Sequence, residues 1–578
     1  MSGFTAVIYK NKKVIPSPKT FSIRSDYEQK MICRTEVTDK FSVQQLTNSK
    51  FLNDKIFVQD DAYFIAIEGI ILNLNELILK ENRTDKNTFS VLKLLYTNYG
   101  ANFVEQLRGD FSGFIYDKKA DSWLLFTNQT GSKRIFVFEN GDYLFFASDL
   151  KQIAALMSEL KIPRKLNKDA AYSILTSGFM LNEISYIEGV TKLLPGCYLE
   201  HKNGKTKTTN YFHLQNIKQT TDTKEQIIEK VDALFRQAIK REFEKDKEYN
   251  YRHIATLSGG LDSRMTVLMA HKMGYTDQLN FTFSQANYLD EQIAKQIAID
   301  HRHEFLFQAL DGGNYLRNVD EIVSYNDGMI LFSGGAHVLK SCKNMNFDDY
   351  GLVHTGLIGD AVLGSFLTKP YPTKPSLAAS VYSSKLIRKT EKYIASVQQN
   401  FESEELYKFY GRAFMGAMNG NYYLDVFSQS VSPFLDVDFL SYCYSIPENL
   451  KYKQKIYIDW IAQKNKEFAH YPWEKTGVSP LISLNNKKYF ALGYYKRMSL
   501  KFFDKLSGKM KSGMNPLDYW LEENKALAQT FETYFEKNIK LVEDEELRND
   551  CKWLFEKGNW GERIQVLTLL SAIKLHFS

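Results

Sequence analysis

The sequence lacks several features that mark secreted, membrane-spanning and zinc-binding proteins. Its five cysteines are scattered without paired spacing, which argues against a disulfide framework and against a zinc site. No apolar run is long enough to span a bilayer, and the start shows no secretory signal pattern. The formal net charge of +6 is small for 578 residues and gives no argument for nucleic acid binding. We therefore expect a cytoplasmic protein that binds no nucleic acid.

The length favours several domains, each with a full hydrophobic core. A chain of 578 residues is long enough for about two to four domains. Hydrophobic residues at 44% and charged residues at 25% are typical of globular proteins, so covalent staples are not needed.

One stretch predicts a phosphate-binding loop. The apolar segment 253–256 predicts a strand before it, and helical spacing from Met265 predicts a helix that ends near Gly274. Two adjacent glycines let the backbone approach an anion, and the first N–H groups of a helix attract negative charge. The serines can donate hydrogen bonds, and Asp262 suits a Mg²⁺ that bridges protein and pyrophosphate. The residues of this stretch are Leu257, Ser258, Gly259, Gly260, Leu261, Asp262 and Ser263.

This loop lacks the lysine and the spacing of the G-x-x-x-x-G-K-[ST] loop of kinases and GTPases. It resembles instead the S-G-G-x-D-S loop of the PP-loop ATPases, which split ATP into AMP and pyrophosphate. The alternative reading is a Gly-Gly turn followed by a serine helix cap. Adenylating chemistry is the working hypothesis.

The first 210 residues are rich in strand patterns, and a polar stretch at 206–223 is expected to link them to the next unit. We expect domains at 1–210 and 220–480, followed by a helical extension at 481–578. The expected strands are 4–9, 63–72, 111–116, 123–127 and 143–147, and the expected helices are 89–96 and 102–107.

Three segments of the first unit carry a family resemblance. They are 64–69 (F-I-A-I-E-G), 107–117 (L-R-G-D-F-S-G-F-I-Y-D) and 146–151 (F-A-S-D-L-K). In this order they are similar to the glutaminase domain of class II glutamine amidotransferases. The segment 193–199 (L-L-P-G-C-Y-L) resembles the exit from that domain in asparagine synthetases. With the loop at 257–263, the chain resembles the asparagine synthetase family over roughly residues 1–480.

The resemblance implies an N-terminal-nucleophile domain, which hydrolyses glutamine with a terminal cysteine, and a synthetase domain that adenylates a carboxylate. Ser2 stands at the position of that cysteine, and a hydroxyl is a weaker nucleophile than a thiol. The family's Asn-Gly-Glu is Glu68-Gly69-Ile70 here, and Thr88 lies near the place of the Asp that grips the glutamine amine. We expect this domain to be a scaffold without glutaminase activity.

Alternating helix and strand patterns between residues 224 and 307 predict a doubly wound parallel sheet. By resemblance, Phe283 and Ser284 end a strand where the family binds adenosine through the backbone. Asp290 and Glu291 have two readings, either as carboxylates at a helix start or as ligands. The expected elements are helix 224–244, strand 279–284, helix 288–300 and strand 304–307.

A second signature spans 354–364 (H-T-G-L-I-G-D-A-V-L-G). It resembles the family's S-G-E-G-S-D-E-x-F-G-G, which implies that Gly356 lies near the reacting carbonyl and that Asp360 shares Mg²⁺ with Asp262. Leu357 and Ala361 replace the two glutamates of that pattern, and the first glutamate is tied to the amine in asparagine synthetases. The alternative reading of Asp360 is a turn cap.

Two further segments follow. The segment 432–436 (S-P-F-L-D) resembles the family's V-P-F-L-D and is assigned to packing. Lys455 stands where the family has a lysine that neutralises pyrophosphate and the developing oxyanion; the alternative is a solvated face shared with Lys451 and Lys453. The segment 473–477 (W-E-K-T-G) resembles the family's closing W-R-x-K.

The last hundred residues carry no nameable motif. Lysines and aromatic residues alternate at 487–511, which favours either the solvated face of an amphipathic helix or a contact with an anionic partner or membrane surface. Helical patterns at 521–534 and 564–575 predict a helical cover over the synthetase unit.

Three functions are open. The first is an AMP-forming amide synthase that uses ATP and Mg²⁺, activates a small-molecule or peptide carboxylate and transfers ammonia or another amine to it. The second is an intramolecular cyclase resembling β-lactam synthetases or lasso-peptide macrocyclases. The third is a catalytically silent scaffold or binding protein. For catalysis we expect Asp262, Asp360 and Lys455, and a homodimer is one open assembly.

Overall fold

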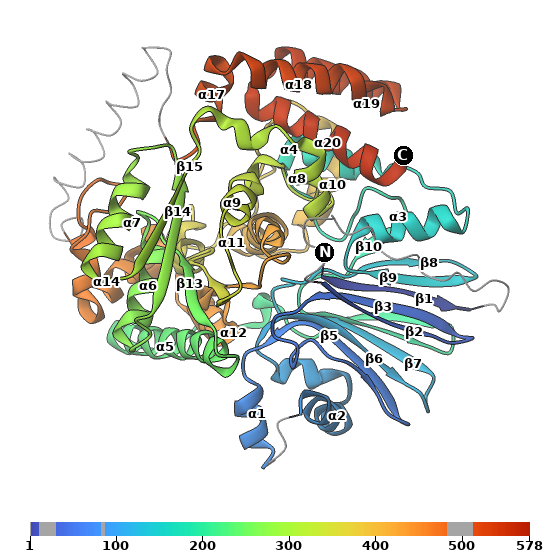
Figure 1. The fold of residues 1–578 in the computed structure, drawn as a ribbon, viewed down its shortest axis with the longest axis horizontal. Coiled ribbons are helices and arrows are strands. Elements are labelled where there is room, and N and C mark those ends of the chain that lie inside the picture. Colours follow the sequence, from blue (N-terminus) through green and yellow to red (C-terminus); the bar gives the residue numbers. More distant parts are fainter. Residues whose placement is uncertain (1, 11–30, 83–86, 482–512) are drawn as a thin grey trace.

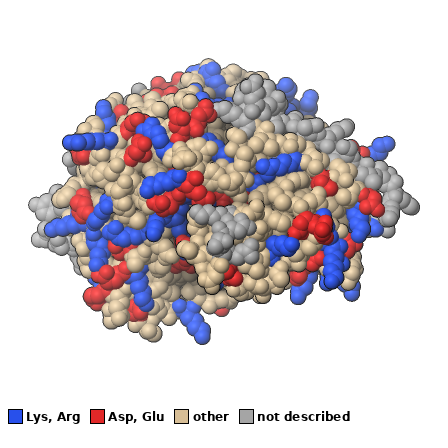
Figure 2. Space-filling model, turned by 60° about the horizontal axis from the view of Figure 1, so that its bottom comes forward, with Lys and Arg blue, Asp and Glu red and all other residues tan. Residues whose placement is uncertain are grey.

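The computed structural model of the protein describes residues 2–10, 31–82, 87–481 and 513–578 (Figure 1). The basic and aromatic segment 487–511 lies outside the described residues. The described chain forms three β-sheets covered by helices, which confirms the predicted mixed α/β fold class. None of the helices in the described part of the chain has the length and apolar content needed to span a bilayer. On the face drawn in Figure 2, Lys and Arg are interspersed with Asp and Glu.

The N-terminal unit contains two antiparallel sheets of six strands, with the orders β10-β8-β9-β1-β3-β2 and β12-β11-β7-β6-β5-β4. All five strands expected here are confirmed. The strands of the first sheet are β1 Gly3–Tyr9, β2 Met31–Val37, β3 Phe41–Asn48, β8 Phe136–Glu139, β9 Tyr143–Ala147 and β10 Val190–Lys192. Those of the second are β4 Phe57–Gln59, β5 Tyr63–Ile71, β6 Gly109–Asp117, β7 Ser122–Thr127, β11 Cys197–Lys202 and β12 Lys205–Asn210.

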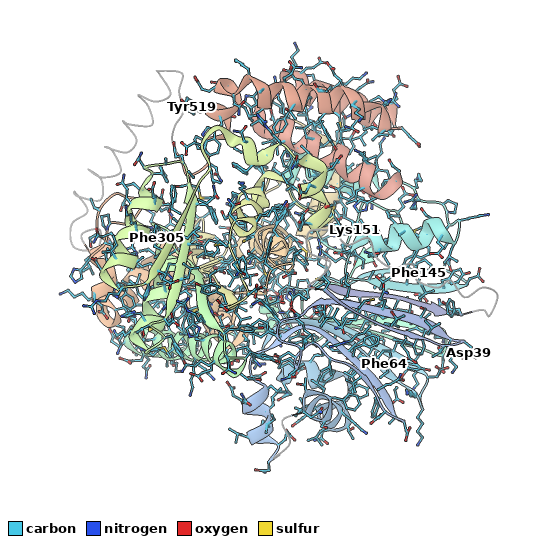
Figure 3. All side chains as sticks on the ribbon, in the orientation of Figure 1. Asp39, Phe64, Phe145, Lys151, Phe305 and Tyr519 are labelled. Atoms are coloured by element: carbon cyan, nitrogen blue, oxygen red, sulfur yellow. The ribbon has the colours of Figure 1, made fainter. Side chains whose placement is uncertain are left out.

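The two sheets face each other across an aromatic core. Phe114 of the second sheet meets Phe4 and Phe146 of the first edge to face, with ring centroids 5.4 and 5.5 Å apart. Phe64 lies in the same core, whereas Phe145 points to the other side of its sheet, towards the helices (Figure 3). The helices of this unit are α1 Leu74–Lys80, α2 Thr88–Tyr99, α3 Leu150–Glu159 and α4 Lys168–Ser177.

One prediction for this unit was wrong. The stretch 206–223 was expected to be a polar linker, but its first residues belong to β12, which pairs with β11 along its whole length. β12 is an edge strand with exposed and half-buried side chains, so it carries no hydrophobic alternation that would reveal it in the sequence.

The second unit is built on a parallel sheet of five strands, in the order β15-β14-β13-β16-β17. The chain adds β14 and β15 on one side of β13 and then β16 and β17 on the other. The strand order therefore reverses between β13 and β16, and ligands bind beside such a point, at the carboxyl ends of the strands. The bounds are β13 Arg252–Thr256, β14 Gln278–Ser284, β15 Glu304–Ala309, β16 Tyr350–His354 and β17 Ser430–Val431.

Helices cover both faces of this sheet (Figure 1). The first, α5, begins with a capping box in which the side chains of Thr223 and Gln226 each accept a backbone N–H. The α-helices are α5 Lys224–Glu248, α6 Leu261–Lys272, α7 Leu289–Asp300, α8 Val319–Asn326, α9 Ser333–Lys343, α10 Ile387–Gln398, α11 Glu404–Lys408, α12 Val437–Ser445, α13 Glu448–Lys451 and α14 Lys455–Lys464. Short 3-10 or π helices are η2 Gly100–Gln106, η3 Leu214–Asn216, η4 Asp311–Leu316, η5 Ala361–Ser365, η6 Phe409–Gly416, η7 Ala417–Tyr423, η8 Pro433–Leu435, η9 Tyr452–Gln454, η10 Lys466–Ala469 and η11 Ile539–Leu541.

The C-terminal helices join both units. The pattern at 521–534 was expected to be one helix, but the chain breaks at Asn524, whose side chain caps the second piece. The last helix packs in one core with α3 and α4 of the first unit and α8 of the second. The C-terminal helices therefore cover both units, and not the second alone as the sequence predicts. The bounds are α17 Leu517–Glu523, α18 Lys525–Asn538, α19 Glu545–Lys557 and α20 Trp560–Phe577.

Candidate active site

The predicted phosphate loop connects β13 to α6, as the sequence indicates. It is folded on itself: the Ser258 N–H donates to Ser263 Oγ at 2.9 Å, and the Gly260 N–H donates to Ser258 Oγ at 3.2 Å. Leu257 continues the strand register by donating its N–H to the Phe281 carbonyl at 2.9 Å. No side chain caps the start of α6, so the N–H groups of its first turn suit an anionic ligand.

The second signature lies directly against this loop, as two glycines allow. A Cβ atom on Gly356 would lie 2.2 Å from Ser263 N, and one on Gly359 would lie 2.7 Å from Asp262 Cγ. Any other residue at these positions would push the two segments apart. The approach lets the Asp360 N–H donate to Asp262 Oδ2 at 2.8 Å. The structure therefore brings together the two carboxylates that the sequence predicts as metal ligands.

The carboxylates of Asp262 and Asp360 form a like-charged pair. Burial raises the pKa of Asp262, and the charge of Asp360 raises it further, to about 8. Tyr457 donates its hydroxyl to Asp262 Oδ1 at 2.9 Å. Neither carboxylate forms an ion pair with a Lys or Arg side chain in the described residues. Two adjacent carboxylates of this kind suit a hard divalent cation such as Mg²⁺, which binds oxygen ligands.

Asp290 holds the phosphate loop from the side. It is buried in the first turn of α7, and its Oδ1 accepts the Gly259 N–H at 2.8 Å. Glu291 instead accepts the Asn287 N–H at 2.6 Å, just before the helix. Of the two readings of this pair, the contacts favour support of the loop and of the helix start.

Two lysines are candidates for the cation of this site. Lys455 is exposed at the start of α14, and its role stays a prediction. The charge of Lys475, in contrast, lowers the pKa of Asp262. The Lys475 segment is docked on the phosphate loop, because the Glu474 N–H donates to the Gly259 carbonyl at 3.0 Å.

Arg264 bonds both to the phosphate loop and to the segment that precedes Lys475. Its guanidinium donates to the carbonyls of Gly259 at 3.0 Å and Tyr471 at 3.0 Å. Sequence reasoning missed Arg264, Tyr457 and Lys475 as parts of this site. Only Lys475 had a signal, its place in the W-E-K-T-G segment, because an internal Arg or Tyr of a helix carries no pattern of its own.

Two other predicted positions lie at the same edge of the sheet. Phe283 and Ser284 end β14, next to the strand that leads into the phosphate loop. Ser284 is fully buried, and its hydroxyl donates to the Gln285 carbonyl at 2.8 Å. In the second signature Ile358 has φ of 59°, a region that branched side chains rarely adopt. Such strain gathers at functional loops.

Ser2 lies at the seam between the two units. It is 8% exposed, its Oγ accepts the Asn48 N–H at 3.3 Å, and its hydroxyl lies 3.5 Å from the Asp425 carbonyl of the second unit. Nearby charges pair with one another: Lys133 Nζ lies 2.8 Å from Asp425 Oδ2. Burial raises the pKa of Glu68, and the cations Lys55 and Lys133 oppose that rise.

Comparisons with known proteins agree with this architecture. Residues 50–212 match the family described as a glutamine amidotransferase domain. Over 330 residues, the chain is 27% identical to a protein of Methanocaldococcus jannaschii assigned as glutamine-hydrolysing asparagine synthetase 2. This match covers 54% of the chain and 62% of that protein. The chain is thus similar to asparagine synthetases over about half of its length. It is also 29% identical over 292 residues to glutamine-hydrolysing asparagine synthetase 2 of Bacillus subtilis, a match that covers 46% of the chain and 37% of the relative.

These family matches span less than two thirds of either relative. Among solved structures, the glutamine phosphoribosylpyrophosphate amidotransferase of B. subtilis aligns with 54% of the chain and 85% of its own length, at 12% identity. Its TM-score of 0.24 is too low to support an argument about the fold. The resemblance to asparagine synthetases therefore rests on the matched sequences.

Proposed function

We propose that this protein, which is similar to asparagine synthetases, forms amides by activating a carboxylate with ATP. The observation that carries the proposal is the contact between the two signature loops, which sets Asp360 against Asp262 at the switch point of the parallel sheet. The similarity to a glutamine amidotransferase domain and to asparagine synthetases supports an amide ligase or amidotransferase. The ATP chemistry and the substrates are our proposal.

In the proposed reaction, the start of α6 and residues 257–263 bind the phosphates of ATP. A carboxylate oxygen of the substrate attacks the α-phosphorus, and the bond from that phosphorus to the bridging oxygen breaks. This step gives an acyl-adenylate and pyrophosphate, whose charge Lys475 is placed to neutralise. An amine then attacks the acyl carbon, loses a proton, and expels AMP as the amide forms. Asp262 and Asp360 would hold Mg²⁺, which supplies neutralisation of phosphate charge when bound.

We further propose that glutamine hydrolysis is lost. A hydroxyl at Ser2 is a weaker nucleophile than a thiol, and it is enclosed by Asn48 and by Asp425 of the other unit. The charges beside it, such as Lys133 and Asp425, compensate one another and offer little to a zwitterionic glutamine. The N-terminal unit then serves as a scaffold for the synthetase unit.

The amine source follows from the second signature. Leu357, which is half-buried, and Ala361, which is buried, replace the two glutamates of the family pattern. Neither position therefore offers a carboxylate to an external ammonium ion. Because glutamine hydrolysis is proposed to be lost, we propose free ammonia, or an amine carried by the substrate itself as in an intramolecular cyclase. A catalytically silent scaffold is the remaining alternative, and the matched pair of Asp262 and Asp360 argues against it.

The test is ATP–pyrophosphate exchange with Mg²⁺ and radiolabelled pyrophosphate, using aspartate first and then a panel of carboxylates, followed by product analysis with ammonium or glutamine. We expect exchange with at least one carboxylate, and amide formation with ammonium but not with glutamine. Asp262→Asn should abolish exchange while its unfolding curve stays close to that of the wild type. Amide formed only with glutamine would refute the loss of glutaminase activity, and equal exchange in Asp262→Asn would refute the site.

A further inference from the structure

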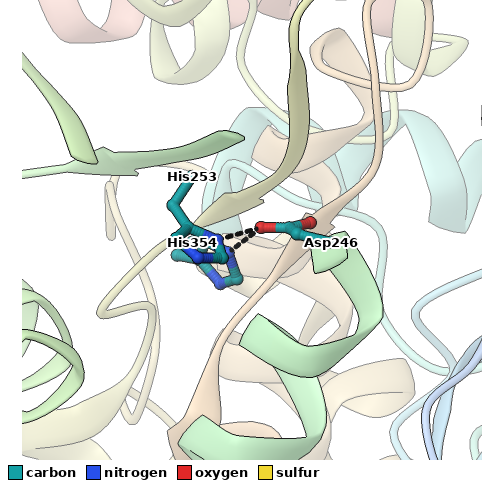
Figure 4. A group of neighbouring side chains, drawn as sticks. All are labelled: Asp246, His253 and His354. Atoms are coloured by element: carbon teal, nitrogen blue, oxygen red, sulfur yellow. Dashed lines mark hydrogen bonds and ion pairs between the residues drawn. The ribbon is translucent and has the colours of Figure 1, made fainter. Parts of the chain in front are cut away.

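A buried network of four titratable side chains includes His354, the first residue of the second signature. His354 Nε2 and His253 Nδ1 each lie 2.8 Å from Asp246 Oδ2, and Figure 4 shows both imidazoles converging on that oxygen. The other ring nitrogen of His354, Nδ1, lies 3.1 Å from Glu242 Oε2. All four side chains are at most 6% exposed. They come from three elements, α5, β13 and β16.

The two carboxylates of this network, Glu242 and Asp246, need a positively charged partner. In the described part of the chain, the ion-pair partners of Glu242 and Asp246 are imidazoles, with no Lys or Arg among them. Two buried carboxylates without a cation would be very unfavourable. The cation can be a proton on an imidazole or a metal ion, since Asp246, His253 and His354 offer three ligand atoms within 4.8 Å of one another.

The hydrogen bonds favour a proton on His354 over a metal ion as the cation of this network. Both nitrogens of the His354 ring face carboxylate oxygens, which accept hydrogen bonds, so a doubly protonated ring satisfies both contacts. The three candidate metal ligands are already joined by bonds of ordinary length. The described residues offer no fourth protein ligand there, as a structural zinc site requires. The His354 ring also stacks on Phe243, with centroids 3.7 Å apart, which fixes its plane.

Electrostatics agree with this assignment. Burial alone lowers the pKa of His354, but the carboxylates of Asp246 and Glu242 outweigh it and raise the pKa to about 9. Burial raises the pKa of Glu242 to about 7, against the effect of His354. The remaining titratable group that faces the His354 ring is His253 of β13. The charges of Asp110 and Asp436 also raise the pKa of Glu242.

The network is coupled to the site through a short piece of chain. His354 ends β16, and the next residue, Thr355, is tied to Val431 through its N–H and its hydroxyl, both at 2.9 Å. Thr266 of α6 donates to the Thr355 carbonyl at 3.2 Å. From there the chain runs through Gly356 to Asp360, whose N–H reaches Asp262.

We propose that His354 is a buried imidazolium, clamped between Glu242 and Asp246, and that it positions the loop carrying Asp360 against Asp262. It is a positioning residue, because it touches neither the loop glycines nor Asp360 itself. The inference concerns the site of the proposed function, but its first two tests need no substrate.

The ionisation is tested by NMR of protein labelled with ¹⁵N in histidine, between pH 6 and 10, with His354→Gln to assign the signal. We expect His354 to stay charged through pH 8 and to titrate near 9, and we expect Glu242→Gln to move its midpoint to lower pH. A neutral ring at pH 7, or a midpoint unchanged in Glu242→Gln, would overturn the proposal. One zinc ion per chain in elemental analysis would also overturn it, in favour of a metal site.

The positioning is tested by hydrogen–deuterium exchange of the folded protein. In His354→Gln the peptide that contains residues 355–362 should exchange at least tenfold faster, while β14 keeps its protection. His253→Gln is the matched control, because it leaves both carboxylate contacts of His354 in place. Equal protection of the loop in His354→Gln and wild type would contradict the positioning role. Uniformly faster exchange across the sheet would show a merely structural role.

ATP–pyrophosphate exchange then separates this inference from the proposed function. If a substrate is found, the wild-type rate should fall above pH 9, and His354→Gln should lower kcat about tenfold without changing the KM for ATP. A His354→Gln variant with wild-type kcat and pH profile would contradict the role in catalysis. If no carboxylate supports exchange in the wild type, the proposed function fails while the NMR and exchange results still decide the network.

Discussion

At the scale of single residues, two lysines compete for one role. Lys455 matches the family pattern by its place in the sequence, at the start of α14, and both it and Lys475 are exposed. Lys475 acts on Asp262 through its charge and lies in a segment whose backbone bonds to the phosphate loop. The spatial argument therefore favours Lys475 as the cation that faces departing pyrophosphate.

Paired substitutions test this choice. Lys475→Ala should slow ATP–pyrophosphate exchange about 100-fold, the scale expected when a group aimed at developing charge is removed. Lys455→Ala is the matched control and should change the rate less than threefold, because Lys455 lies outside the segment whose backbone bonds to the phosphate loop. The reverse ranking would restore the role that the sequence assigns to Lys455.

Single residues also show which parts of the site can be predicted from the sequence. The phosphate loop, Asp360 and the glycines beside it were predicted, because loops that approach phosphate require glycine, and each motif is contiguous. Tyr457, Arg264 and the network around His354 were not predicted, because their partners lie far apart in the chain. Asp246 and His354, for example, are 108 positions apart. Nothing local distinguishes a buried histidine that is charged from one that is neutral.

The pH dependence of stability is a residue-scale prediction as well. A histidine whose pKa is raised from 6.5 to about 9 in the folded state stabilises it fully below pH 6.5, and this contribution disappears as the pH rises through 9. Glu242, with its pKa raised to about 7, acts in the same direction over a lower range. Urea unfolding of the wild type should therefore show stability falling between pH 7 and 9, with a smaller fall in His354→Gln. Equal slopes in the two proteins would contradict the assignment.

At the scale of elements, the decisive feature is the close approach of the second signature to α6. Because Gly359 lies against Asp262 and Phe434, an added methyl group must displace one of them. The sequence shows the glycine, but only the fold shows what it touches. The same holds for β12, which is missed because an exposed edge strand carries no apolar pattern.

Gly359→Ala tests this approach. The exchange rate of the variant should be more than tenfold below that of the wild type. Its free energy of unfolding should fall by about 1–3 kcal/mol, as expected for overpacking. Gly141→Ala is the control, because no atom lies within 4 Å of the added carbon there. Activity and urea unfolding are measured on both. Wild-type exchange in Gly359→Ala would mean that the loop is free to move away from Asp262.

At the scale of the whole molecule, buried ion pairs connect the units. Lys133 of the first unit and Asp425 of the second lie 2.8 Å apart, with side chains 5% and 7% exposed. Lys245 of α5 similarly lies 3.2 Å from Asp54 of the first unit, with side chains 2% and 0% exposed. Such pairs fix one relative orientation of the units, because a displaced unit would leave charges buried without partners.

The Lys133–Asp425 pair can be tested by a double-mutant cycle. Lys133→Met should lower the free energy of unfolding by about 3–5 kcal/mol, since it leaves Asp425 buried and unpaired. The double variant Lys133→Met/Asp425→Leu should lose less than the sum of the two single changes. Urea unfolding measures all four proteins. Strict additivity would mean that the two side chains do not sense each other.

The helix α20 also affects how this protein is made. Gln565 of α20 donates to the carbonyl of Ile174 in α4, a contact between residues 391 positions apart. Ribosomes add about 5–20 residues per second, so α4 waits roughly 20–80 seconds for the helix that packs on it. We expect the apolar side chains that α3 and α4 turn towards α20 to be exposed during that interval. We expect chaperones that bind exposed apolar segments to bind such a nascent chain, because its first unit reaches its final state only after α20 has been synthesised.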